Sequence, residues 1–271
     1  MERFGPARAD RPGGASRPRI RLGGIGIDPV TESEAVGRVL EAFESGDGGH
    51  IVTPNVDILA TARRRPELRA VIERAELVVA DGAPLVWAAG LAKTPLPERV
   101  AGSDLVWSLA EAAAERGLRL ALLGGTPDSA ARPTERAVEV LEERHPGLKV
   151  VGAWCPPMGF SEDEAHWNAL VERVQAAAPD LVYVGLGFPK QEFVIERLRR
   201  EAPKAWFLGC GASIDFIAGY RRRAPKWMQR SGTEWLFRMC SEPRRLVRRY
   251  LRDDVPEALR LLAAALRERR R

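Results

Sequence analysis

Short apolar runs alternate along the chain with longer stretches in which apolar residues recur at helical spacing. After the run Leu181–Val184, for example, Phe193, Val194 and Leu198 repeat with the period of a helix. Alternating strands and helices predict an α/β fold, here a Rossmann-like parallel sheet with helices on both faces. The predicted strands are Gly48–Thr53, Glu76–Ala80, Leu118–Leu123, Leu148–Trp154, Leu181–Val184 and Lys204–Leu208.

Polar residues in front of the helical stretches predict where helices begin. Thr31-Glu-Ser-Glu34 has the pattern of a capping box, and Ser103 and Ser161 are predicted to cap two later helices. Pro66 is predicted to open another helix, because proline fits the first helical position. Ordered structure is expected to begin with Ile20–Ile27.

Composition divides the chain into three predicted parts. Residues 1–19 are rich in Arg, Gly, Pro and Ser without periodicity, which predicts a disordered tail. Residues 20–219 are expected to form one Rossmann-like core, since 271 residues with 45% hydrophobic content suit one domain and an appendage. Residues 220–271 are expected to form a basic, amphipathic, helical appendage.

Charge is concentrated in this appendage. Residues 221–271 contain 16 Arg or Lys and 6 Asp or Glu, a net charge of +10 within a total of +5. A basic segment indicates an anionic partner, and tryptophans such as Trp227 and Trp235 among the arginines favour an anionic membrane surface. A solvated basic face is the alternative. No recognised RNA-binding motif is present, so nucleic acid is not an expected partner.

Cysteine spacing and the length of the apolar runs indicate a cytoplasmic protein. Cys155, Cys210 and Cys240 match neither a disulfide framework nor a zinc site, which favours a reducing compartment. No run reaches the roughly 18 apolar residues that suggest a membrane span, and the polar N-terminus is unlike a secretory signal. We expect peripheral contact with the inner face of the cell membrane.

Three predicted strands end in glycine turns at what should be one edge of the sheet, where ligands of parallel sheets bind. Lys190 and Gln191 fall in the first turn of a helix, where unpaired amide groups attract anions, so a phosphate-bearing ligand would fit. No G-x-G-x-x-G pattern fits, which disfavours a nicotinamide cofactor. Ordinary strand-to-helix loops are the alternative. The candidate binding residues are Gly124, Gly125, Gly185, Gly187, Lys190, Gly209, Gly211 and Asp215.

Two other strand ends carry polar side chains. Thr53 and Asn55 follow one strand and Asp81 follows the next along the chain, so they are expected to face the same edge. Asp81 is a candidate catalytic carboxylate. An aspartate before glycine is also a common turn former, so its position alone leaves both roles open.

Seven motifs, taken in order, closely resemble the WecG/TagA/CpsF family of glycosyltransferases over roughly residues 20 to 252. They are Thr53-Pro-Asn55, Ala80-Asp-Gly82, Leu122-Leu-Gly-Gly125, Gly185-Leu-Gly-Phe-Pro-Lys-Gln-Glu192, Gly209-Cys-Gly-Ala-Ser-Ile-Asp-Phe216, Arg223-Ala-Pro-Lys-Trp227 and Gly232-Thr-Glu-Trp-Leu-Phe-Arg238.

The resemblance implies an inverting, metal-independent glycosyltransferase without a cofactor. It would move an N-acetylmannosamine-like sugar or related hexose from a UDP-sugar to a polyprenyl-diphosphate-linked sugar, in the synthesis of cell-surface polysaccharide, teichoic acid or exopolysaccharide. It also implies that Asp81 is the general base, with Thr53 and Asn55 beside it and Gln191 in the same pocket. The third glycine turn, ending at Asp215, is where we place the uridine.

The same resemblance assigns the appendage a part in the site. The arginines Arg238, Arg245 and Arg248 would complete the site over the diphosphates and contact the membrane. No Asp-x-Asp pair occurs in the chain to hold a metal, so helix amino ends and these arginines are expected to meet the charge of the leaving diphosphate.

Departures from the family pattern leave the donor sugar undetermined. Pro84 stands where many members have glycine, and Thr233 replaces a common leucine. Two other functions remain open: a catalytically silent nucleotide-sugar-binding scaffold, and a basic nucleic-acid-binding protein, which would leave Asp81 and the glycine turns unexplained. A homo-oligomer is also left open.

Overall fold

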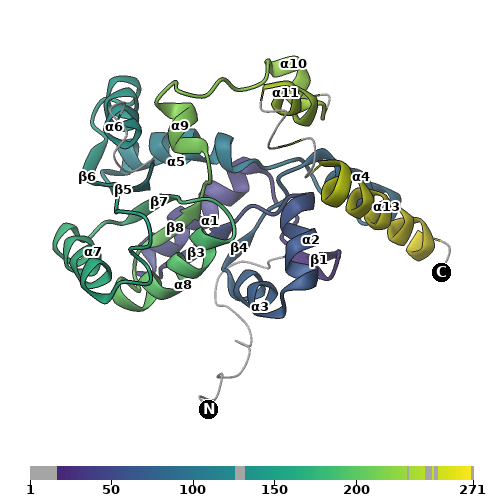
Figure 1. Cartoon of the computed structure of the whole chain (residues 1–271), viewed down its shortest axis with the longest axis horizontal. Helices are drawn as coiled ribbons and strands as arrows, with labels where there is room; N and C mark the ends of the chain where they lie inside the picture. The colour runs from purple at the N-terminus through teal and green to yellow at the C-terminus, as the bar shows by residue number, and fades with distance from the viewer. Residues whose placement is uncertain (1–16, 126–131, 231, 242–245, 247–249, 270–271) are drawn as a thin grey trace, which may run out of the picture.

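The computed structural model describes residues 17–125, 132–230, 232–241, 246 and 250–269. Within these ranges, six strands form one parallel sheet in the order β4-β3-β8-β7-β5-β6 (Figure 1). All six predicted strands are present, which confirms the α/β prediction. The strands are β3 (Gly49–Val52), β4 (Leu77–Val78), β5 (Arg119–Gly124), β6 (Lys149–Trp154), β7 (Leu181–Gly185) and β8 (Trp206–Gly209).

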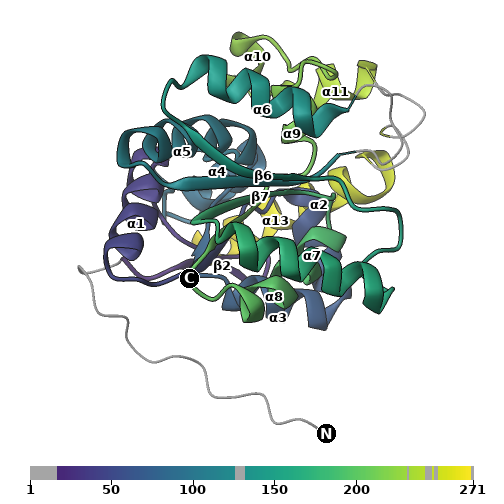
Figure 2. The ribbon, with the colours of Figure 1, turned by 90° about the vertical axis from the view of Figure 1, so that its left-hand side faces the viewer.

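Successive strand residues point to opposite faces of the sheet, and each face is covered by helices (Figure 2). Leu122 on β5 is in register with Tyr183 on β7, and both belong to one apolar cluster. Their neighbours Ala121 and Val182 belong to the cluster on the other face. The first face is covered by α1 (Glu32–Glu44), α5 (Gly102–Arg116), α6 (Pro133–Arg144) and α9 (Ser213–Ile217), and the second by α7 (Glu164–Ala177) and α8 (Lys190–Glu201).

A third apolar cluster lies at the β3–β4 end of the sheet. Asp28 ties an N-terminal hairpin to this end, because its carboxylate accepts hydrogen bonds from the Val78 amide (2.8 Å) and the Arg19 guanidinium (3.0 Å). The cluster is formed by the antiparallel hairpin of β1 (Ile20–Leu22) and β2 (Ile25–Ile27) together with α2 (Val56–Arg64), α3 (Pro66–Arg74) and α4 (Ala83–Leu91).

The last described segment is helical and returns to the core. Its elements are α10 (Lys226–Arg230), α11 (Glu234–Ser241), the π-helical turn η1 (Tyr250–Asp254) and α13 (Val255–Arg269). Helix α13 lies along α4 (Figure 1), and its Leu261 and Ala265 are buried in the third cluster. Glu257 on α13 forms an ion pair with Arg63 on α2 (2.9 Å).

The predicted helical C-terminal segment is therefore confirmed, and α13 contributes to the core. The boundaries at residues 19 and 219 stay predictions. In the part of the chain that the structure describes, no helix combines the length and apolar character needed to cross a membrane.

Candidate active site

The carboxyl ends of five adjacent strands place the predicted site residues in one row. In the order of the sheet, these are Asp81 after β4, Thr53 after β3, Gly209 on β8, Gly185 on β7 and Gly124 on β5. Adjacent strands lie about 4.8 Å apart, so Asp81 and Gly124 are separated by about 19 Å. The prediction of a shared edge is correct, but the carboxylate stands at one end of an elongated site.

Asp81 occupies a partly enclosed position in this row. Its backbone amide donates to the Pro54 carbonyl (2.8 Å), which holds the residue beside the end of β3. About 29% of the surface of its side chain remains accessible to solvent. Burial raises the pKa of the Asp81 carboxyl from 3.8 to about 6, against the opposing charge of Arg99. Such a group is ionised at neutral pH and is still basic enough to accept a proton.

Arg99 links Asp81 to two other carboxylates. Its guanidinium lies 3.4 Å from Asp81, 3.3 Å from Asp104 at the start of α5, and 3.9 Å from Glu234 on α11. Arg223 then binds Asp104 through two hydrogen bonds of 2.5 and 2.8 Å. Residues before and after position 219 thus meet in one charged network beside Asp81.

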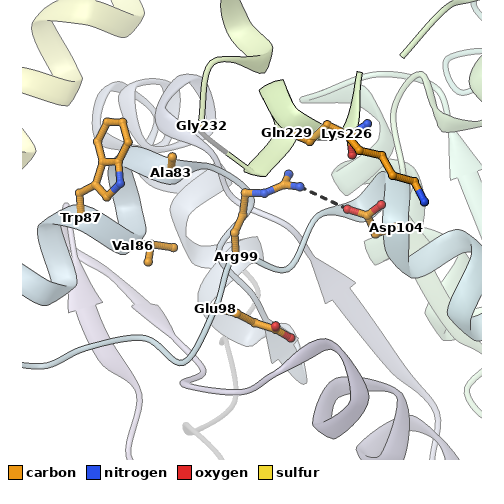
Figure 3. A pocket seen from close by; sticks show the side chains of 9 residues that line it. All are labelled: Ala83, Val86, Trp87, Glu98, Arg99, Asp104, Lys226, Gln229 and Gly232. Carbon is orange, nitrogen blue, oxygen red and sulfur yellow. Dashed lines mark hydrogen bonds and ion pairs between the residues drawn. The ribbon is translucent and has the colours of Figure 1, made fainter. Parts of the chain in front are cut away.

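This network forms part of the wall of a pocket of about 550 Å³ (Figure 3). Trp87 on α4 stands on one side and Asp104 on the other, with Arg99 between them. Gly232 closes the pocket near α4, where an added Cβ would lie 2.6 Å from the Cβ of Ala83, so a side chain there would force the two segments apart. The complete lining is Ala83, Val86, Trp87, Glu98, Arg99, Asp104, Lys226, Gln229 and Gly232.

Thr53 and Asn55 lie next to Asp81 but differ in their local roles. Thr53 is buried, and its hydroxyl lies near Gly102 at the start of α5. Asn55 is the N-cap of α2, and its side-chain oxygen accepts a hydrogen bond from the Ile58 amide (3.1 Å). This hydrogen bond accounts for an asparagine at position 55 without any contact to a substrate.

Some of the candidate glycines are required by packing. At Gly124, an added Cβ would lie 2.5 Å from the carbonyl oxygen of Gly185. At Gly125, it would lie 2.4 Å from the Thr134 hydroxyl, and at Gly185 it would lie 2.7 Å from the side chain of Ile214. Gly124 thus allows β5 and β7 to approach each other, and Gly125 and Gly185 leave room for side chains of α6 and α9, whether or not a ligand is bound.

Gly187 and Gly211 are different. They have φ angles of +77° and +55°, and an added Cβ at either would meet nothing within 4 Å. Positive φ explains the glycine at each position, and the open space in front of each backbone leaves room for a ligand.

Gln191 is held by the protein at both ends of its amide group. Its nitrogen donates to Glu192 (3.0 Å), and its oxygen accepts from the Gly211 amide (3.0 Å). Only 4% of the residue is exposed. The backbone amides of Gln191 and Glu192 are also occupied, by the carbonyls of Gly187 and Pro189, and so are already paired in this turn.

The remaining charged candidates already have protein contacts where the structure describes them. The Lys190 ammonium lies 4.8 Å from the centre of the Phe160 ring, and Asp215 forms an ion pair with Arg221 (3.1 Å). Arg238, half-buried on α11, lowers the pKa of Asp81 by its charge. Two candidates, Arg245 and Arg248, lie outside the described residues.

The sequence analysis missed several residues of the site. Arg99 follows no periodic pattern, so nothing in the sequence marks it. Arg223 and Glu234 fall within two of the quoted motifs, which was a usable signal. Glu192 directly follows Gln191 and is almost completely buried, together with His50 on β3. Among the described residues, no group of His, Cys, Asp and Glu is arranged to hold a metal ion.

Comparisons with known proteins show which family the sequence resembles. Residues 20–271 match the model of the Glycosyl transferase WecG/TagA/CpsF family. The chain is also 30% identical over 226 residues to a protein of Bacillus spizizenii named N-acetylglucosaminyldiphosphoundecaprenol N-acetyl-beta-D-mannosaminyltransferase. That alignment covers 80% of this chain and 84% of the relative.

Proposed function

We propose that this chain moves a sugar from a UDP-sugar to a polyprenyl-diphosphate-linked sugar, with inversion at the anomeric carbon. The chain belongs to the WecG/TagA/CpsF family of glycosyl transferases. The name of the Bacillus relative supports an N-acetylmannosamine-like donor sugar and an acceptor in which N-acetylglucosamine is linked through a diphosphate to undecaprenol. The observation that carries the proposal is the Asp81 carboxylate, with a pKa of about 6, beside Arg99 on the pocket wall.

The donor nucleotide is assigned to the middle of the sheet edge. Gly187 and Gly211 present backbone to open space there, after β7 and β8. Close approach of a backbone without side chains suits a diphosphate or a ribose. From this position, a sugar on the diphosphate would extend along the row of strand ends towards Asp81.

The acceptor is assigned to the pocket. Lys226 supplies positive charge for a diphosphate, while Trp87 and Val86 supply an apolar wall for a sugar face or the first part of the lipid chain. Arg99 on the pocket wall lies 3.4 Å from Asp81, so an acceptor hydroxyl held near Arg99 would come within reach of that carboxylate.

The chemical step needs one base and charge for the leaving group. Asp81 removes the proton of the acceptor hydroxyl as its oxygen attacks the anomeric carbon. The bond from that carbon to the diphosphate oxygen breaks on the opposite side, and UDP leaves with the bonding electrons. One displacement inverts the anomeric centre. We assign to Arg238 and the other arginines of the appendage the stabilisation of the negative charge that develops on UDP.

Peripheral binding to an anionic membrane is part of the proposal. Trp227 on α10 is 67% exposed, and Trp87 and Trp235 are also exposed. Together with the +10 charge of residues 221–271, exposed tryptophans suit the interface of an anionic bilayer. Such binding would bring the pocket to a lipid-linked acceptor.

The test is an assay of the purified protein with a panel of UDP-sugars and a short-chain polyprenyl-diphosphate-N-acetylglucosamine, in the presence of EDTA. We expect UDP release and a lipid-linked disaccharide with one donor, and an anomeric configuration opposite to that of the donor by NMR. Turnover that requires an added divalent metal would contradict the metal-independent mechanism. UDP binding without turnover across the panel would instead favour the scaffold reading.

A further inference from the structure

A buried pair of titratable side chains lies directly behind the proposed donor turn. His50 on β3 and Glu192 in the first turn of α8 are both almost fully buried, with His50 Nε2 2.8 Å from Glu192 Oε2. Neither atom has a hydrogen-bond partner elsewhere among the described residues. The pair joins the strand that leads to Thr53 with the helix that begins after Gly187.

Joining β3 to α8 does not by itself explain the pair, because apolar side chains of similar size would serve that purpose as well. The second oxygen of Glu192 has a further contact. Glu192 Oε1 accepts a hydrogen bond from the side-chain nitrogen of Gln191 (3.0 Å).

That hydrogen bond fixes which way the Gln191 amide points. The Gly211 backbone N–H donates to the Gln191 oxygen (3.0 Å). If the amide were reversed, its NH₂ group would face the Gly211 N–H, and its oxygen would face the Glu192 carboxylate. Both contacts would be repulsive, so Glu192 holds Gln191 in the one orientation that supports Gly211.

The strand end is shaped around the same two side chains. A Cβ at Gly209 would lie 2.7 Å from the Gln191 nitrogen and 2.9 Å from Glu192 Oε1. Gly209 therefore leaves room for the Gln191–Glu192 pair beneath the turn. Gly211, two residues later, has a positive φ and faces open space.

We propose that Glu192, supported by His50, is a positioning residue for nucleotide binding: it orients Gln191, and Gln191 holds the Gly211 amide in the turn that receives the uridine diphosphate. This inference rests on the donor site proposed above. It also assigns Gln191 a supporting role beneath the turn in place of direct contact with the reacting atoms.

Three variants separate positioning from a purely structural role. Glu192→Leu removes the acceptor for Gln191 and leaves His50 without a partner. Glu192→Gln retains an acceptor oxygen, and its NH₂ group can donate to a neutral His50. The double variant His50→Leu/Glu192→Leu replaces the buried pair by apolar side chains and restores packing without restoring the acceptor. Glu196→Gln, on the same helix in a surface ion pair with Arg74, is the control.

The measurements are UDP affinity by calorimetry, KM and kcat for the UDP-sugar, and thermal unfolding. We expect Glu192→Leu to weaken UDP binding and raise the donor KM about tenfold or more, the effect of losing one hydrogen bond to a charged group, with a smaller change in kcat. Glu192→Gln and the control should stay within about threefold of the natural protein. The double variant should regain the lost thermal stability and keep the weak UDP binding.

A stably folded double variant that binds UDP as the natural protein does would overturn the inference, even if Glu192→Leu alone fails to fold. Measurements of UDP binding and activity on the natural protein distinguish this result from a failure of the proposed function. If it neither binds UDP nor uses any UDP-sugar, the donor assignment is wrong and the positioning role falls with it. If it does bind UDP, the variants decide the role of Glu192 alone.

Discussion

Arg99 Nη1 lies 3.4 Å from Oδ1 of Asp81, the carboxylate with the raised pKa. The contact is long for an ion pair, and the same guanidinium is shared with Asp104 and Glu234. Burial therefore dominates the pKa of Asp81, and Arg99 only moderates it. This balance leaves a carboxylate that is ionised near neutral pH without being locked to one partner, and each prediction about Asp81 depends on it.

Replacing Asp81 with asparagine should remove the base and preserve the shape of the site. We expect Asp81→Asn to bind UDP normally and to lower kcat by about two orders of magnitude or more, the usual contribution of a general base. Asp180→Asn is the control. Asp180 precedes the amino end of β7, whereas the candidate site lies at the carboxyl ends of the strands, so this variant should leave kcat unchanged. Near-normal turnover by Asp81→Asn would remove the aspartate from the mechanism.

The rate should depend on pH through the same group. Because the base must be unprotonated, kcat/KM is expected to rise with pH up to about 6 and to level off above it. Removing the positive charge in Arg99→Gln should move this rise to higher pH, since Arg99 lowers the pKa of Asp81. A flat profile between pH 5 and 7 would contradict the assignment.

The raised pKa of Asp81 should also affect how the free energy of unfolding depends on pH, which can be measured without an activity assay. The folded state binds a proton at Asp81 more tightly than the unfolded state, so this group favours folding below pH 3.8 and loses that effect as the pH rises through about 6. The free energy of unfolding of Asp81→Asn, relative to the natural protein, should therefore increase by up to about 3 kcal/mol between pH 4 and pH 7. Urea unfolding at several pH values measures it.

Asp180 provides a control of opposite sign for that experiment. Burial raises the pKa of Asp180, but hydrogen bonds from Arg119 outweigh it and hold the pKa below its usual value. Its contribution to stability is present at neutral pH and is lost as the pH falls. Asp180→Asn should therefore lose stability relative to the natural protein as the pH rises towards 4, and it should change little between pH 4 and pH 7, where the effect of Asp81→Asn develops.

The packing of α13 on the core can be tested with two leucines of the same helix. Leu261 is 5% exposed and Leu259 is 63% exposed. We expect Leu261→Ala to lower the free energy of unfolding by about 2–4 kcal/mol and Leu259→Ala to change it by less than about 0.5 kcal/mol. Equal effects in a denaturation experiment would mean that α13 does not pack on α4 in solution.

Membrane binding should depend on tryptophan in the appendage. Replacing Trp227 with alanine removes an exposed aromatic group and is expected to weaken binding to anionic vesicles about tenfold, measured by co-sedimentation. Met158, which is 81% exposed on the loop between β6 and α7, serves as the control. Met158→Ala should bind vesicles like the natural protein. Vesicle binding that is insensitive to Trp227→Ala would argue against α10 as the contact.

The sheet could be predicted from sequence because each strand is a short apolar run, and most of these runs end at a polar or glycine residue. Helix starts were harder to predict. The capping box at Thr31 is present, but α5 begins at Gly102, one residue before the predicted cap Ser103. Helix α7 is capped by Asp163 rather than Ser161. A capping side chain needs a particular backbone conformation as well as the right residue type, and the sequence does not specify that conformation.

Part of the candidate site could also be predicted from the sequence. The order of strands and helices implied a parallel sheet, and a parallel sheet brings Thr53 and Asp81 to one edge. The pairing of Arg223 with Asp104 joins positions 119 residues apart, and no local pattern reports such a contact. The burial of Gln191 was equally invisible, since a glutamine at the start of a helix is usually exposed.

Two of the charges that act on Asp81, those of Glu234 and Arg238, belong to residues that follow Gly219. If this segment moved away, Asp81 would gain water and its pKa would fall towards 3.8, the value of a carboxyl group in solution. A carboxylate with so low a pKa is a poor acceptor for the proton of a sugar hydroxyl. Asp81 would then be an effective base only while the segment after Gly219 is in place.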